Sequence, residues 1–250
     1  WAWGLVQVGE APAQRYGVSA AQGLARAQIV ILPGYGQSAE AWFETARDLN
    51  QRGLTVWILE RAGQGGSGRF TTPRDLGHAP SFNPDVAATR ALLTEVVRPT
   101  LERPVTVVAE AEAAAVALLA IERRAPVQRL VLSSPLLDPS PPALSIPGAQ
   151  DRPPVNWTPW SRDRPYRVEG FRGDPNRARV QQAWQLANPD LRMTGPSPGW
   201  RTANAEAAKA ALDGLAGVGV PVLVTTDPER DQPWPPCWRL ADCRVIRFPG

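Results

Sequence analysis

The chain has 250 residues, of which 43% are hydrophobic and 20% are charged, and its formal net charge is +3. This length and apolar content suit one large domain with a buried sheet, and the composition excludes global disorder. Arginine supplies nearly all of the positive charge, and no basic run alternates with aromatic residues, so nucleic-acid binding has no support. His78 is the only histidine, which argues against a metal site of the Cys/His type. Because no apolar stretch reaches about 18 residues, we expect no transmembrane helix.

The first half of the chain alternates short apolar runs with segments of helical periodicity. Ser38 is a candidate N-cap for a helix that stops at Gly53. A glycine-rich loop follows at residues 63–68, and Asn83 opens a further helix. The strands predicted in this half cover residues 1–8, 14–19, 28–32 and 54–59.

Residues 105–116 run from an apolar strand directly into an alanine-rich helix, predicted over 113–123. In a nucleophile elbow of this kind, the positions two residues before and after the nucleophile must be small, because the turn is tight. Ala109 and Ala113 fill those two positions and place Ala111 at the apex. A methyl group cannot attack a carbonyl, so the segment predicts an elbow without a nucleophile.

The second half contains an irregular insertion. Proline, arginine and tryptophan concentrate in residues 135–200, which we predict to form a cap on a core made of residues 1–134 and 201–250. Strands and a helix resume the alternation at residues 129–132, 203–212, 220–225 and 245–248. Strands that alternate with helices at this spacing predict an α/β fold, with a doubly wound, mostly parallel sheet.

Taken together, four motifs in this order resemble the lysophospholipase and monoacylglycerol-lipase branch of the α/β-hydrolase superfamily. Residues 32–42 are similar to its oxyanion loop and first helix, with Pro33 where the family usually has histidine. The glycine-rich loop resembles the family's loop, with Glu60 in place of the usual aspartate and Ala62 in place of a usual arginine. The other two motifs are the elbow at 105–116 and the strand and turn at 130–137.

The resemblance implies a Ser–acid–His triad and an oxyanion loop, formed here by Gly34, Tyr35 and Gly36. Ala111 occupies the nucleophile position. The acid is expected in the loop after strand 220–225, where Asp231 is the best match and Asp227 the second. The family's histidine follows the last strand, beyond Gly250, and we expect both ends of the chain to be edges of a larger polypeptide.

Three functional hypotheses follow from these replacements. The lost serine and the altered loops favour a non-catalytic protein that acts as a binding or structural subunit of a larger assembly. The first alternative is a hydrolase of ester or lipid substrates that uses Glu110, Glu112 or Asp231, which requires a carboxylate directed into the site with a shifted pKa. The second is an acyl or lipid carrier. No cofactor is expected, and the sequence leaves open whether the chain is an enzyme.

The two carboxylates beside Ala111 are weak nucleophile candidates. Placing either Glu110 or Glu112 at the apex puts the other at a position that must be small. An ionised Glu112 would also repel a developing oxyanion by roughly 3 kcal/mol at about 5 Å. The alternative is that both are polar side chains decorating an inactive elbow. Without a catalytic side chain, we predict that the turn at Ala111 is relaxed rather than strained.

Two further features bear on partners and compartment. The basic cluster of the predicted cap could bind a phosphate-bearing headgroup or an acidic partner, or form a solvated face; it comprises Arg162, Arg164, Arg167 and Arg172. Cys237 and Cys243 either form a disulfide, which would indicate an oxidising compartment such as the periplasm, or remain two thiols. The compartment is otherwise unknown, with a cytoplasmic or membrane-peripheral location favoured.

Overall fold

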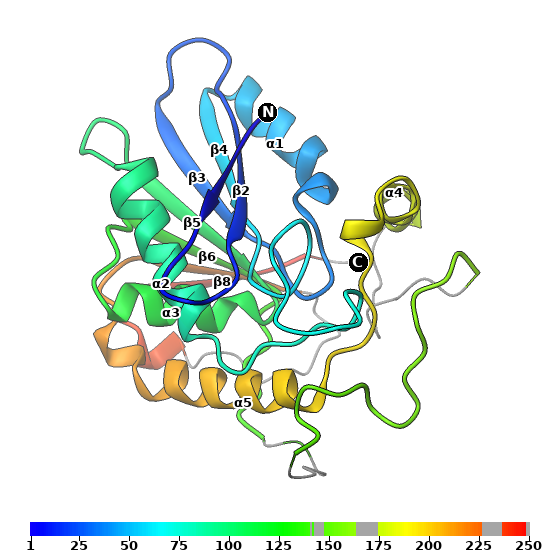
Figure 1. Cartoon of the computed structure of the whole chain (residues 1–250). Helices are drawn as coiled ribbons and strands as arrows, with labels where there is room; N and C mark the ends of the chain where they lie inside the picture. Colours follow the sequence, from blue (N-terminus) through cyan, green and yellow to red (C-terminus); the bar gives the residue numbers. More distant parts are fainter. Residues whose placement is uncertain (141, 143–147, 164–174, 227–236, 249–250) are drawn as a thin grey trace.

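The structure, a computed structural model, describes residues 1–140, 142, 148–163, 175–226 and 237–248 (Figure 1). Its eight-stranded sheet has the order β1-β2-β4-β3-β5-β6-β7-β8. The pairs β1–β2 and β2–β4 are antiparallel, and the other neighbours are parallel. The strands are β1 (Ala2–Val6), β2 (Gln14–Ser19), β3 (Ala27–Leu32), β4 (Leu54–Leu59), β5 (Val105–Glu110), β6 (Arg129–Ser133), β7 (Val222–Thr226) and β8 (Cys243–Arg247). The predicted α/β fold class is confirmed.

Helices cover both faces of this sheet. Successive residues of a buried strand point to opposite faces, so apolar side chains on each face pack against helices. Ile29 and Ile31 of β3 pack with Ala46 of α1 on one face, whereas Val30 and Leu32 pack in the cluster that contains α2, α3 and α5. The α-helices are α1 (Phe43–Gln51), α2 (Asn83–Ala91), α3 (Ala113–Glu122), α4 (Pro175–Ala187) and α5 (Pro198–Asp213). Short 3-10 turns are η1 (Ala39–Trp42), η3 (Pro189–Leu191), η4 (Leu215–Gly217) and η5 (Cys237–Arg239), and η2 (Leu92–Val97) is a π-helix.

Helix α3 is the element that supports the elbow. Its residues from Ala113 to Ile121 are all buried. A helix that is apolar on every side is stable only when it is packed on every side. The alanines allow close approach of neighbours, and α3 lies among β5, α2 and α5 (Figure 1). The residue before this helix therefore has little freedom to move.

Two helix starts differ from the sequence-based expectation. Ser38 precedes η1, but its side chain makes no cap hydrogen bond, so its predicted capping role is wrong. The N–H of Ala39 instead donates to the Glu60 carboxylate at 2.7 Å, and a distant acid thus replaces the local cap. Helix α5 begins at Pro198, earlier than predicted, because the Ser197 side chain caps it by accepting from the Trp200 N–H.

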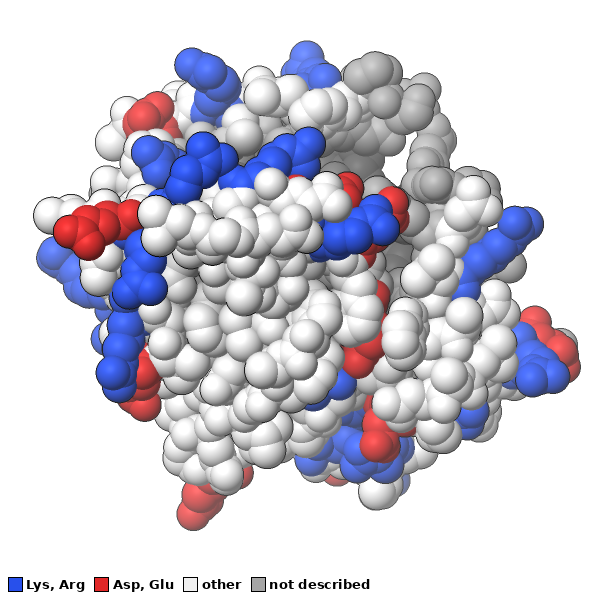
Figure 2. All heavy atoms as spheres, turned by 90° about the horizontal axis from the view of Figure 1, so that it is seen from above, with Lys and Arg blue, Asp and Glu red and all other residues white. Residues whose placement is uncertain are grey.

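Charge and covalent links complete the fold. Seen from above, Lys and Arg side chains lie around the margin of a broad central area without charged groups (Figure 2). Cys237 and Cys243 form a disulfide that joins η5 to the start of β8. Among the helices that the structure describes, none is long and apolar enough to span a bilayer.

Candidate active site

The elbow at Ala111 joins β5 to α3 through a left-handed backbone conformation. Its φ is +49°, a region that costs a residue with a Cβ about 1–3 kcal/mol. The Ala111 N–H donates to the Ser133 carbonyl at 3.0 Å, and the Ala111 carbonyl accepts from the Leu136 N–H at 3.1 Å. The predicted relaxation of this turn is therefore wrong. Hydrogen bonds to the end of β6 and the loop after it hold the strained conformation whatever side chain stands at the apex.

The oxyanion loop lies directly against this elbow. Strands β3 and β5 are parallel neighbours with Leu32 paired to Ala109, so the segments that follow them leave the same edge of the sheet. A Cβ at Gly34 would lie 3.2 Å from the Cβ of Ala111, which is tighter than ordinary contact. Only glycine allows this approach without displacing the elbow.

Both carboxylates beside Ala111 bind this loop. The Gly34 N–H donates to Glu110 Oε2 at 3.1 Å, and the Tyr35 N–H donates to Glu112 Oε2 at 3.2 Å. Gln37 Nε2 donates to the other oxygen of Glu110 at 2.8 Å. The interpretation of these two side chains as decoration of the elbow is wrong, because they occupy backbone donors beside the nucleophile position.

Two glutamines from other elements bind the remainder of the loop. Gln64 Oε1 accepts from the Gly36 N–H at 3.4 Å, while Gln64 Nε2 donates to the Gly34 carbonyl at 3.2 Å. Gln181 of α4 donates to the Gly36 carbonyl at 2.7 Å. The N–H groups of Gly34, Tyr35 and Gly36 are thus all bonded to side chains of the chain itself.

The electrostatics of Glu110 follow from its position. Burial raises the pKa of this carboxyl above its ordinary value, and the neighbouring Glu112 carboxylate acts in the same direction. The hydrogen bonds from Gly34 and Gln37 oppose that rise. Glu110 therefore has the shifted pKa that the hydrolase hypothesis requires.

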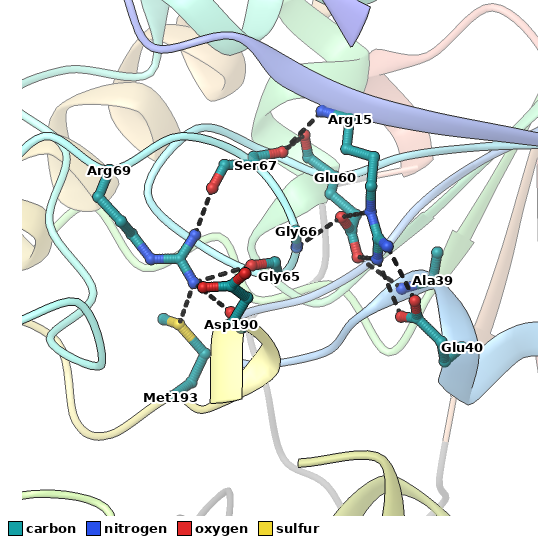
Figure 3. Close-up of polar contacts among 10 residues, drawn as sticks. All are labelled: Arg15, Ala39, Glu40, Glu60, Gly65, Gly66, Ser67, Arg69, Asp190 and Met193. Carbon is teal, nitrogen blue, oxygen red and sulfur yellow. Dashed lines mark hydrogen bonds and ion pairs between the residues drawn. The ribbon is translucent and has the colours of Figure 1, made fainter. Parts of the chain in front are cut away.

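Beside the site, Glu60 organises the glycine-rich loop (Figure 3). Its side chain is fully buried and accepts from Arg15 Nε at 2.7 Å and Arg15 Nη2 at 2.8 Å. The N–H groups of Ala39 and Gly66 complete its bonds, at 2.7 and 2.8 Å. Glu40 pairs with the same guanidinium at 2.9 Å. One buried carboxylate therefore connects β2, η1 and the loop after β4.

Arg69 joins that loop to the 135–200 segment. Its guanidinium donates to the Ser67 carbonyl at 2.6 Å and to the Gly65 carbonyl at 2.8 Å (Figure 3). The same side chain reaches the Asp190 carbonyl at 2.8 Å. The segment beside the site is therefore attached to the core through main-chain carbonyl groups.

Comparison with known proteins places this geometry in a family. Residues 23–226 match the Hydrolase_4 family, described as serine aminopeptidase, S33. The chain belongs to this family. The S33 match includes the elbow and both loops, and it agrees with the predicted resemblance to the lysophospholipase-like branch.

Relatives of this S33 chain agree with the assignment. Lysophospholipase L2 of Escherichia coli strain K12 is 26% identical over 211 residues, covering 78% of this chain and 61% of the relative. The chain thus spans about 61% of that relative's length. A probable hydrolytic enzyme from Pseudomonas aeruginosa PAO1 is 15% identical with a TM-score of 0.64, covering 100% of this chain and 87% of that one. A bromoperoxidase from Bacillus anthracis is 13% identical with a TM-score of 0.61, covering 99% and 91%.

Of the triad positions predicted from the sequence, the described residues include one, the nucleophile position at Ala111. Asp231 and Asp227 lie outside the described residues, as do three members of the predicted basic cluster, Arg164, Arg167 and Arg172. Arg162 is described and exposed. The acid position and the basic cluster therefore stay predictions.

His78 lies at the start of α5. It is buried, and its Nδ1 lies 2.7 Å from the Oγ of Ser197, the N-cap residue of that helix. Burial lowers its pKa, which disfavours the charged form. These contacts agree with a structural role for this histidine. Sequence reasoning missed this contact and both glutamines of the oxyanion loop.

A second buried carboxylate, Asp85 of α2, predicts a pH dependence of stability. It accepts from the Ala62 N–H at 3.0 Å, and burial raises its pKa from the ordinary 3.8 to about 6, with Arg61 opposing the rise. Because the folded state binds this proton more tightly, Asp85 stabilises the fold below its unfolded pKa and loses that contribution as pH rises through about 6. The quantity to compare is the free energy of unfolding of the unaltered chain minus that of Asp85→Asn. This difference should be about 2 kcal/mol larger at pH 4 than at about pH 7.

Urea unfolding of both chains across that range measures this difference. The control is Asp213→Asn, which removes an exposed carboxyl whose pKa is lowered by its hydrogen bond to Lys209. The difference in free energy of unfolding between the unaltered chain and Asp213→Asn should become smaller from pH 7 to pH 4, opposite to the change for Asp85→Asn. An Asp85→Asn difference that stays constant with pH would contradict the raised pKa of Asp85.

Proposed function

We propose that this S33-family chain is a non-catalytic α/β-hydrolase, retained as a binding or structural protein. One observation carries the proposal: carboxylates of Glu110 and Glu112 occupy the oxyanion-loop donors beside an apex that holds only a methyl group. An ester hydrolase of this fold needs a nucleophile at the apex and free donors in the loop. Neither requirement is met in this arrangement.

The expected loss of catalytic rate is large enough to support this proposal. Removing one oxyanion donor costs a hydrolase about 100-fold to 1,000-fold in rate. Here the Gly34 and Tyr35 donors are both engaged by side-chain carboxyl groups, those of Glu110 and Glu112. A developing oxyanion would have to displace a carboxylate and then remain close to it.

The hydrolase hypothesis is retained as the alternative, because Glu110 has a raised pKa and lies at the site. Its difficulty is geometric. Both of its oxygens already accept hydrogen bonds, from Gly34 and from Gln37, so an attack by this carboxylate would have to break one of them. The same attack would need the Gly34 donor for the substrate's oxyanion.

For the ligand, we propose an acyl or lipid molecule, or a protein subunit that contacts the same region. The support for a lipid is the likeness to a relative named Lysophospholipase L2. The support for a subunit is the retention of the sheet and of a strained turn whose apex carries only a methyl group. The carrier hypothesis predicts a co-purifying lipid and the subunit hypothesis a co-purifying protein.

A p-nitrophenyl ester assay combined with native mass spectrometry of the same purified sample tests this proposal. We expect turnover at background, together with a co-purifying lipid or subunit. Glu110→Gln and Glu112→Gln serve as matched variants that keep side-chain size. Turnover above background that either variant abolishes would overturn the proposal and make the elbow carboxylates catalytic.

Installing serine at the apex should not create an esterase. Ala111→Ser supplies a hydroxyl, but the donors of Gly34 and Tyr35 remain bound to carboxylates. We expect its ester turnover to match that of the unaltered chain in the same assay. An increase of roughly 100-fold or more would show that the loop donors are accessible to an oxyanion.

A further inference from the structure

A buried guanidinium lies just before the glycine-rich loop and has no hydrogen-bond partner among the residues that the structure describes. Arg61 follows the end of β4 by two positions, and it is only 2% exposed. Its Nε, Nη1 and Nη2 atoms are all buried, and no described residue accepts a hydrogen bond from any of them. Every nitrogen of a guanidinium is a donor, and burying a charged donor without an acceptor is costly. Arg61 therefore requires an acceptor that the described residues do not supply.

Aromatic rings hold this guanidinium in position. The Arg61 Cζ lies 4.9 Å from the ring centroid of Phe82 and 5.8 Å from that of Trp200. These two rings are 5.5 Å apart, and Trp200 packs edge-on against Tyr35 at 4.6 Å. Cation–π attraction offsets part of the cost of burying the charge, but a ring face is only a weak acceptor for N–H groups. The guanidinium is therefore fixed while its donors remain unsatisfied.

The neighbouring Asp85 balances the charge of Arg61 without satisfying its donors. Asp85 Oδ1 accepts from the Ala62 N–H at 3.0 Å, whereas Arg61 acts on this carboxyl through space and lowers its pKa. A structural partner of Arg61 would accept hydrogen bonds from it, and Asp85 does not. Gln14, which bonds to the same carboxyl, has a buried Oε1 that also lacks a partner among the described residues. Donors and acceptors around Asp85 thus stay unsaturated by one another.

We propose that Arg61 binds the carboxylate group of a small organic acid. The planar fork of a guanidinium matches the two oxygens of a carboxylate, which can accept a pair of parallel hydrogen bonds. The depth of Arg61 favours a small planar anion over a bulkier tetrahedral one. The residue also follows the carboxyl end of a parallel strand, where α/β proteins bind ligands. This site is separate from the oxyanion-loop donors, and it does not depend on whether the chain is an enzyme.

Asp85 should make this binding depend on pH. Among the described groups that act on Asp85, Arg61 is the charged one, since Ala62 and Gln14 contribute neutral hydrogen bonds. An ionised Asp85 repels a carboxylate and competes for Arg61, so the form with a protonated Asp85 is the one that binds. Burial raises the Asp85 pKa to about 6, so this form makes up about a tenth of the chains at pH 7 and about nine-tenths at pH 5. The apparent dissociation constant should therefore fall about 10-fold from pH 7 to pH 5.

Saturation-transfer NMR of formate titrated into the full chain tests the proposal, because formate stays ionised over this pH range. We expect saturable binding that weakens roughly 100-fold in Arg61→Met, which removes the donors, and roughly 10-fold in Arg61→Lys, which keeps the charge without the fork. Arg47→Met removes an exposed guanidinium and is the matched control, with binding unchanged. Asp85→Asn should bind formate about 10-fold more tightly than the unaltered chain at pH 7, and its affinity should no longer change with pH.

The other outcomes decide against the proposal. Formate binding of equal strength in Arg61→Met, or a signal that does not saturate, would overturn the assignment to Arg61. Displacement of formate by equimolar chloride or inorganic phosphate would assign the site to a different anion. An affinity that is the same at pH 5 and pH 7 in the unaltered chain would contradict the coupling to Asp85. If Arg61→Met loses its folded circular-dichroism spectrum, Arg61→Lys carries the test, because it retains the buried charge.

Discussion

Glu112→Ala is expected to bind small oxyanions, such as butylphosphonate, about 100-fold more tightly than the unaltered chain. The substitution frees the Tyr35 N–H, whose partner is Glu112 Oε2 at 3.2 Å. It also removes a charge that would repel a bound anion by roughly 3 kcal/mol at about 5 Å, which corresponds to about 100-fold in affinity. Isothermal titration calorimetry of both chains measures the difference.

The matched control for this experiment is Glu112→Gln. Its amide oxygen can still accept from the Tyr35 N–H, so the donor stays occupied although the charge is gone. Because the charge accounts for the roughly 3 kcal/mol, we expect Glu112→Gln to show most of the gain in anion affinity. Glu112→Ala should exceed it only through the freed Tyr35 N–H. Equal anion affinity in the unaltered chain and Glu112→Ala would show that Glu112 does not block the oxyanion loop.

The second large effect concerns the stability of the loops that surround the site. Glu60→Ala should lower the free energy of unfolding by about 3–5 kcal/mol, because it leaves a partly buried guanidinium without its main partner. The carboxylate of Glu60 accepts from Arg15 twice and from the N–H groups of Ala39 and Gly66. Guanidinium chloride unfolding, monitored by far-ultraviolet circular dichroism, gives the value.

An exposed ion pair provides the comparison. Arg47 and Asp48 lie 3.2 Å apart with both side chains about half exposed, and exposed pairs of this kind contribute about 0–1 kcal/mol. Asp48→Ala should therefore leave the midpoint of unfolding almost unchanged. If Glu60→Ala unfolded at the same denaturant concentration as Asp48→Ala, the buried network would not stabilise the loop.

The parts of the fold that local patterns determine were predictable from the sequence. The strand expected over residues 54–59 matches β4, because an apolar run lies between Gly53 and the glycine-rich loop. The apex of the elbow was predictable because small residues at 109 and 113 leave only one register. In both cases a few neighbouring residues suffice.

The contacts of the site were not predictable in the same way. Gly34 and Glu110, which share a hydrogen bond, are 76 residues apart in the chain, and no local pattern encodes that pairing. The φ of Ala111 likewise depends on bonds to Ser133 at the end of β6 and to Leu136 in the loop after it. Sequence reasoning considered the side chain at the apex, whereas the surrounding main chain determines its conformation.

The way Ala111 is held has a consequence for protein engineering. Its N–H and carbonyl are both bonded to residues at the end of β6 and just beyond it, so the neighbouring chain, and not the apex side chain, maintains the turn. A side chain introduced at this position would be presented in the orientation that the scaffold already enforces. Cysteine or a non-natural amino acid placed there would accordingly serve as a rigid attachment point for a probe or a synthetic catalyst.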